Sequence, residues 1–172
     1  MQERADRLNN QAITFASDGA FTEAIACFKR AITLDKDNYL LWYNLGLTYR
    51  DCGKLKDACD CLEIAANYSP DNLDVKETLA TLYLSLGKAE NVKSICMEML
   101  DSNPSSAHFW TLLGVVEFQA ENYEKAADFF EHAVFFNPYY LDALYNLKDT
   151  YTTLGNQKGK IECEKKILQI KK

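Results

Sequence analysis

The stretch from Trp42 to Gly53 reads WYNLGLTYRDCG and places a glycine, Gly46, inside a strongly helical segment. Apolar or small residues recur there at intervals of three and four, which is the spacing of one face of an α-helix. A glycine inside a helix costs about 1 kcal/mol relative to alanine. We therefore predict that a second helix approaches Gly46 too closely for a larger side chain.

The same stretch belongs to a repeat with a period of about 34 residues. The only prolines, Pro70, Pro104 and Pro138, are one period apart, and the two tryptophans, Trp42 and Trp110, are separated by two periods. The same step aligns further columns of leucine, small residues and glycine: Leu45, Leu79, Leu113 and Leu147; Ala12, Gly46, Ala80 and Gly114; Gly19, Gly53, Gly87 and Gly155. This periodicity divides the chain into five units, at 5–38, 39–72, 73–106, 107–140 and 141–172.

Each unit is predicted to form two helices joined by a short turn. The turn carries a glycine in four of the five units, which suits the left-handed conformation that often ends a helix. The proline that follows the second helix in three units prevents its continuation. The chain is therefore predicted to be all-α, with the recurring small residues at contacts between helices.

Composition narrows the class of protein. Nineteen basic and twenty-five acidic side chains give a formal charge of −6, which disfavours nucleic acid and anionic membranes as partners. The first ten residues, MQERADRLNN, contain no apolar run of the signal-peptide kind, and no stretch approaches the roughly 20 apolar residues of a membrane helix. We therefore expect a cytoplasmic location and read the six cysteines as reduced thiols.

These columns resemble the tetratricopeptide repeat (TPR) family over nearly the whole chain. Unit two carries the family's pattern of Trp, Leu, Gly, Tyr, Ala, an apolar residue, Ala and Pro at Trp42, Leu45, Gly46, Tyr49, Ala58, Leu62, Ala65 and Pro70. The resemblance implies a single domain over 1–172, a right-handed α-solenoid of about five repeats. It also implies a concave groove lined by the first helix of each unit, with the second helices on the convex side.

Some units depart from the family pattern. Unit four has Glu117 in the column where three other units have Tyr49, Tyr83 and Tyr151, and unit three has Val92 where alanine is usual, so looser helix packing is expected there. Unit five has Lys160 and Glu164 in columns that are apolar elsewhere. This polar second helix is typical of a solvent-facing terminal cap.

The resemblance implies that the groove is a peptide-binding site. An asparagine recurs at the sixth place of three units, and an amide that both donates and accepts hydrogen bonds can hold the backbone of an extended peptide. Apolar and aromatic residues at nearby places would supply anchors for partner side chains. The predicted site residues are Asn10, Tyr43, Asn44, Leu47, Thr78, Leu112, Val115, Phe118, Tyr145 and Asn146.

Charges at the predicted groove positions favour a neutral or basic partner segment with apolar anchors. The acidic residues Asp6, Asp51, Asp74, Glu77, Asp142 and Asp149 oppose only Arg50. TPR proteins that hold the acidic tails of chaperones use a clamp of lysine, asparagine and arginine. The corresponding places, taken from unit one, are Asn9, Ile13, Asn44, Asp74 and Thr78, and they lack the cations. A chaperone-tail adaptor of that type is therefore disfavoured.

The sequence contains no recognisable catalytic or metal-binding motif. The two histidines, His108 and His132, belong to no catalytic pattern, and no zinc-type spacing or phosphate-binding glycine loop is present. We predict a non-enzymatic protein-protein interaction scaffold without a cofactor, which binds an extended or helical segment of a partner. Two alternatives stay open: a structural subunit that self-associates through the convex face and the last helix, where Ile167 and Ile170 would cover an edge, or the targeting module of a larger enzyme.

Overall fold

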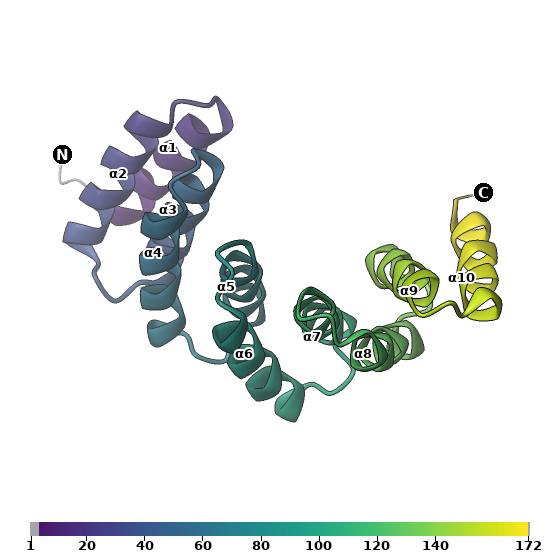
Figure 1. Cartoon of the computed structure of the whole chain (residues 1–172). Coiled ribbons are helices and arrows are strands. Elements are labelled where there is room, and N and C mark those ends of the chain that lie inside the picture. Colours follow the sequence, from purple (N-terminus) through teal and green to yellow (C-terminus); the bar gives the residue numbers. More distant parts are fainter. Residues whose placement is uncertain (1–3, 172) are drawn as a thin grey trace. The chain divides into compact units, whose positions relative to one another are not determined.

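The computed structural model describes residues 4–171, so residues 1–3 and Lys172 of the predicted 1–172 domain lie outside the described part. Those described residues form ten α-helices and no strand (Figure 1). The helices are α1 Ala5–Ser17, α2 Phe21–Leu34, α3 Tyr39–Asp51, α4 Leu55–Tyr68, α5 Leu73–Ser85, α6 Ala89–Ser102, α7 Ala107–Gln119, α8 Tyr123–Phe136, α9 Leu141–Thr153 and α10 Gln157–Ile170. The prediction of an all-α chain is confirmed.

The helices group into two compact units, of which the first ends at Leu82 and the second begins at Tyr83. In the first unit, α1 packs on α2, α2 on α3, and α3 on α4. In the second unit, α6 packs on α7, α7 on α8, α8 on α9, and α9 on α10. Short turns join α1 to α2 and α7 to α8, and such connections make neighbouring helices antiparallel.

The small column in the first helices exists because the two helices of a pair approach closely. A Cβ atom added to Gly46 would stand 2.9 Å from Cγ of Leu62, on the partner helix α4. A Cβ atom added to Gly114 would stand 2.5 Å from the ring of Phe130, on α8. The sequence prediction of a close helix approach is therefore confirmed, and the approaching helix is the second one of the same pair.

The turn between paired helices requires a left-handed residue. Gly53 has φ +80° and no protein atom lies within 4 Å of the place where its Cβ would stand, so the backbone conformation rather than space selects glycine there. In the fourth pair the equivalent residue is Glu121, which adopts φ 61° without being glycine. The turn geometry is thus kept even where the sequence lacks the favoured residue.

In two of the units, a tryptophan hydrogen bond connects the first helix to the turn that precedes it. The indole N–H of Trp42 donates to the backbone oxygen of Lys36 at 2.8 Å. The indole N–H of Trp110 donates to the oxygen of Pro104 at the same distance. The two acceptors, like the two tryptophans, are separated by two periods of the repeat. The same hydrogen bond therefore recurs at equivalent positions of units two and four.

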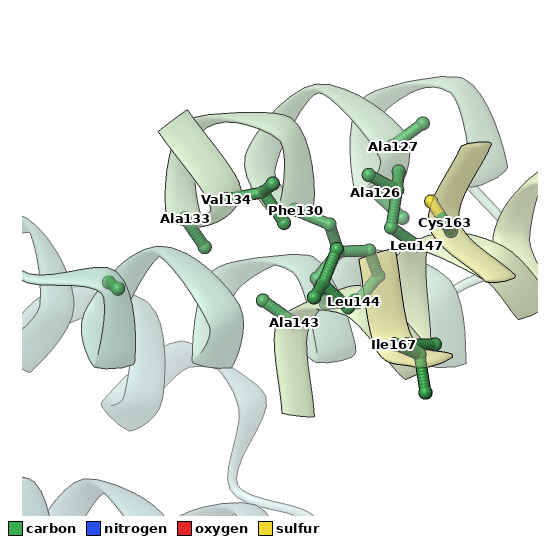
Figure 2. Close-up of a cluster of buried hydrophobic side chains, with 11 residues drawn as sticks. Ala126, Ala127, Phe130, Ala133, Val134, Ala143, Leu144, Leu147, Cys163 and Ile167 are labelled. Atoms are coloured by element: carbon green, nitrogen blue, oxygen red, sulfur yellow. The ribbon is translucent and has the colours of Figure 1, made fainter. Parts of the chain in front are cut away.

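A hydrophobic cluster in the second unit joins α8, α9 and α10 (Figure 2). It contains Phe130 from α8, Leu144 and Leu147 from α9, and Cys163 and Ile167 from α10. Ile167 is only 6% exposed, because α10 turns this face toward the chain's own core. The prediction that Ile167 and Ile170 cover an edge through self-association is therefore wrong for Ile167, and Ile170 packs against the same cluster.

A buried charged cluster occupies the place where looser packing was predicted. Glu117 is 2% exposed, and its carboxylate accepts hydrogen bonds from Asn122 Nδ2 at 2.8 Å and Lys125 Nζ at 3.3 Å. Lys93 Nζ lies 3.0 Å away and completes an ion pair with it. Burial raises the pKa of Glu117, but these three partners outweigh it and the pKa is lowered. Glu117 thus joins α6, α7 and α8 by hydrogen bonds and ion pairs.

Candidate functional site

The predicted site residues all lie on the first helices of the pairs. Within each unit these helices are neighbours, since α1 contacts α3 and α7 contacts α9. The first unit carries Asn10, Tyr43, Asn44, Leu47 and Thr78. The second unit carries Leu112, Val115, Phe118, Tyr145 and Asn146. The predicted site therefore consists of two surfaces, one on each unit.

Hydrogen bonds between helices occupy part of the polar surface of the first unit. Asn44 Nδ2 donates to Asn9 Oδ1 at 3.0 Å, and Asn9 is only 9% exposed. The hydroxyl groups of Tyr43 and Thr78 lie 3.2 Å apart, within hydrogen-bond distance. One donor of Asn44 therefore holds α3 to α1, while its Oδ1 and second N–H remain suited to a ligand. Asn10 is exposed and Leu47 half-buried.

Threonines support the asparagine column in a way that the sequence interpretation missed. The hydroxyl groups of Thr14, Thr48 and Thr150 donate to the backbone oxygens four residues earlier, at distances of 3.1, 2.8 and 2.7 Å. Those oxygens belong to the column asparagines Asn10, Asn44 and Asn146. Thr48 and Thr150 are buried at 3% and 0% exposure, so the bond satisfies a hydroxyl that would otherwise be unpaired. The recurrence of Asn and Thr four residues apart in the sequence could have predicted these hydrogen bonds.

A small hollow opens between α7 and α9 in the second unit. It has a volume of about 100 Å³, and its walls are Val115 and Phe118 from α7 and Asn146 and Asp149 from α9. The buried ring of Phe130 on α8 also lines it. A cavity of about 150 Å³ holds a benzene molecule, so this hollow suits a single aliphatic side chain. Three of the predicted site residues therefore lie together at one recess.

Leu112 differs from the prediction because it is only 5% exposed. Helix α7 carries buried residues on most of its circumference, among them Phe109, Thr111, Leu113 and Val116, whereas Val115 is only half-buried. A helix that is apolar on most sides is largely covered by its neighbours, and Leu112 is part of that packing. It does not present a surface to a partner in this structure, and the prediction of Leu112 as an exposed anchor needs this correction.

Cations lie beside the aromatic residue of α9, where the sequence interpretation expected mainly acids. Lys148 Nζ stands 5.4 Å from the ring centroid of Tyr145, and Lys171 Nζ stands 5.2 Å from it. Lys148 also pairs with Asp149 at 3.1 Å. This surface is therefore of mixed charge, acidic at the hollow and basic at Tyr145.

The predicted cation of the first unit is neutralised locally. Arg50 Nη2 lies 2.8 Å from Asp51 Oδ1, and its Nε donates to the same oxygen at 2.9 Å. Both side chains are about half exposed, so the pair is worth less than about 1 kcal/mol. A partner segment would meet a nearly neutral contact at this place.

Residues 4–171 lack two other features, a metal-binding cluster and a membrane-spanning helix. That range contains no group of three or more His, Cys, Asp or Glu side chains placed to hold a metal ion. None of its helices combines the length and the apolar character needed to cross a membrane. Burial raises the pKa of the Cys61 and Cys96 thiols to about 12, which keeps them protonated and poorly nucleophilic.

Paired antiparallel helices that recur with the period of the sequence define the chain as a helical repeat protein of the α-solenoid class. Profiles described as TPR repeat or tetratricopeptide repeat match residues 14–50, 39–72 and 98–140, which together make up more than half of the chain. The protein belongs to the tetratricopeptide repeat family.

Known proteins with similar sequences are much longer. The cytochrome c-type biogenesis protein CycH of Pseudomonas aeruginosa is 32% identical over 115 residues, which are 65% of this chain and 28% of that protein. The N-terminal acetyltransferase A complex auxiliary subunit NAA15 of Arabidopsis thaliana is 22% identical over 129 residues, which are 75% of this chain and 14% of that protein. The chain thus spans less than a third of the length of these relatives.

Solved structures with the same fold cover nearly the whole chain. MamA from Desulfovibrio magneticus RS-1 superposes with a TM-score of 0.85 at 17% identity, over 99% of this chain and 97% of that one. YrrB, described as a TPR protein with an unusual peptide-binding site, superposes with a TM-score of 0.72 at 22% identity, over 95% of this chain and 84% of that one. At these identities the likeness establishes the fold alone.

Proposed function

We propose that this protein is a non-enzymatic interaction scaffold that binds a segment of another protein on the first helices of its repeats. The observation that carries the proposal is the hollow between α7 and α9, where Val115, Phe118 and Asn146 meet. Recesses lined by apolar side chains with a few polar groups at the rim are typical ligand sites. The solved structure of YrrB, a protein of the same fold, is described as having a peptide-binding site, which supports a similar use here.

The chemistry of the second unit suggests how the segment binds. An aliphatic side chain of the partner enters the hollow between Val115 and Phe118. The amide of Asn146 pairs with the partner's backbone, and the exposed carboxylate of Asp149 faces a lysine or arginine one or two residues away. Tyr145, flanked by two ammonium groups, offers a ring face for a further contact. A neutral or basic segment with apolar anchors fits this arrangement.

The first unit would contribute contacts of the same kind. Asn10 and Asn44 would hold the backbone, and Leu47 and the ring of Tyr43 would pack on apolar side chains. Thr78 takes part through its hydroxyl contact with Tyr43. Leu112 is buried, so its proposed role is to hold α7 in place by packing and not to contact the partner.

Selection of binding peptides tests the proposal directly. A random peptide library is panned on the folded chain, and enriched sequences are expected to carry an aliphatic residue next to a lysine or arginine. Their affinity is then measured by calorimetry with the wild type and with a variant in which Asn146→Ala and Asp149→Lys are combined. The variant is expected to bind at least about tenfold more weakly, because it loses a hydrogen bond and a charge contact.

A matched control makes the same change of charge elsewhere. Asp101→Lys alters an exposed aspartate on α6, the second helix of its pair, and is expected to leave peptide affinity unchanged. Peptides that bind both variants as well as they bind the wild type would place recognition outside the first helices. The site assignment would then be wrong.

A further inference from the structure

Helix α8 exposes an acidic stripe that ends in an aromatic residue. Glu124, Asp128, Glu131 and Phe135 follow one another at intervals of four, three and four residues, so they lie along one face of the helix. All four are exposed, and Phe135 is 77% exposed. The opposite face of α8 carries the buried residues of the hydrophobic cluster. We refer to these four residues as the α8 stripe.

Phe135 stands between two hollows. One has a volume of about 670 Å³, and its lining residues are Asp128, Glu131, His132, Phe135 and Phe136. The other has a volume of about 390 Å³ and reaches from Glu131 and Phe135 on α8 to Glu162 and Lys166 on α10. A large exposed aromatic ring beside recesses, with carboxylates at their rims, is the composition expected of an interaction surface.

Helix α10 exposes a stripe of the opposite charge. Lys158, Ile161, Lys165 and Leu168 follow at intervals of three, four and three residues and are all exposed. The two aliphatic side chains are unusually open to solvent, at 39% for Ile161 and 63% for Leu168. The other face of α10 carries Cys163 and Ile167 into the core, so these four residues, the α10 stripe, point away from it.

We propose that the protein associates with itself by placing the α10 stripe of one copy on the α8 stripe of another. The lysines of α10 face the carboxylates of α8, and Leu168, which ends its stripe as Phe135 ends the other, packs on Phe135 and the hollows beside it. The two stripes match in charge, in apolar content and in length, since each spans about three helical turns. The chain itself therefore supplies an occupant for the α8 stripe.

This contact joins two different surfaces. It either forms twice in a two-fold pair, in which each copy places its α10 stripe on the α8 stripe of the other, or forms once per pair and adds copies head to tail into a ring or a chain. The surface lies on second helices and is separate from the proposed peptide site on α7 and α9. Self-association and peptide binding can thus fail or hold independently.

Analytical ultracentrifugation of the wild type tests the first consequence. The weight-average mass is expected to rise with protein concentration above that of the monomer and to fall when salt is added, because the contact includes opposite charges. The variant Glu124→Lys with Asp128→Lys reverses the α8 stripe, and Lys158→Glu with Lys165→Glu reverses the α10 stripe. Each is expected to weaken association about tenfold or more, because like charges then face each other.

Mixing the two variants tests whether the α10 stripe of one copy meets the α8 stripe of another. The α8 variant keeps an intact α10 stripe, and the α10 variant keeps an intact α8 stripe. One intact pair of stripes remains, and the two reversed stripes are again opposite in charge, so the mixture is expected to associate more strongly than either variant alone. Circular dichroism confirms that both variants are folded. A wild type that stays monomeric at every concentration, variants that associate like the wild type, or a mixture that stays monomeric overturns the proposal.

Discussion

The buried carboxylate of Glu117 should stabilise the second unit, and Glu117→Gln removes its charge while keeping its shape. The bond to Lys93 is charge-assisted, 3.0 Å long and only partly open to water, so its loss costs about 1.5–3 kcal/mol. The bond to Lys125, whose side chain is 59% exposed, adds about 0.5 kcal/mol or less. The substitution also removes the desolvation cost of a buried charge, and this offsets part of the lost stability. We expect a net loss of about 1–2 kcal/mol in the free energy of unfolding, given these typical strengths of charged hydrogen bonds and exposed ion pairs.

The same residue should make stability depend on pH in the acid range. Because its pKa in the folded chain is lowered from the ordinary value of 4.5, the stabilising effect of Glu117 is fully present above that value. It is lost as the pH falls through the lower pKa of the folded state. The difference in stability between wild type and Glu117→Gln should therefore shrink as the solution is acidified below about pH 4.5.

Urea unfolding followed by circular dichroism, at neutral pH and in steps down to acid, provides the measurement. Glu121→Gln is the matched control, since it makes the same change at an exposed residue four positions away. The control should shift the midpoint little. An unchanged or higher midpoint for Glu117→Gln at neutral pH would refute the reasoning, because it would mean that the desolvation of the carboxylate outweighs its three partners.

Three further changes test the packing and the chemistry of the chain. Glu121→Gly should raise the urea midpoint by an equivalent of about 0.5–1 kcal/mol, because glycine adopts the observed φ of 61° without strain, and a lower midpoint would contradict this. Gly114→Ala should lower the melting temperature in calorimetry, with a loss of about 1–3 kcal/mol in the free energy of unfolding, because the added Cβ would stand 2.5 Å from the Phe130 ring. This loss should exceed the gain from the better helix propensity of alanine, and an unchanged melting temperature would mean that α7 and α8 separate easily. Alkylation by iodoacetamide at pH 8, read by mass spectrometry, should leave Cys61 and Cys96 unmodified until urea is added, because their pKa values are raised to about 12, and rapid native labelling would be evidence against that burial.

The period of the repeat was enough to predict the helices, their pairing and the family. The spacing of apolar residues indicates which residues lie on one face of a helix, and a recurring glycine indicates where the backbone is crowded or left-handed. Both features can therefore be predicted from the sequence alone. Gly46 was correctly explained from the sequence as a close helix contact. The column of Asn10, Asn44 and Asn146 was found as well, although the threonines that support it were not.

What covers each helix face was decided by the tertiary structure. Leu112 lies in the predicted groove column but is buried, because α7 is packed on most of its circumference. Glu117 was expected to loosen the packing, yet Lys93 and Lys125 reach it from α6 and α8. Lys171, at the end of α10, lies beside the ring of Tyr145 on α9.

The sequence by itself determined the repeat, the two helices of each unit and the residues available on each face. Only the tertiary structure decided which of those residues meet, which carboxylate is buried among cations and where a hollow remains between helices. The physical reason is that helical periodicity depends on interactions between residues three or four positions apart, whereas burial and pairing depend on neighbours brought in from other helices.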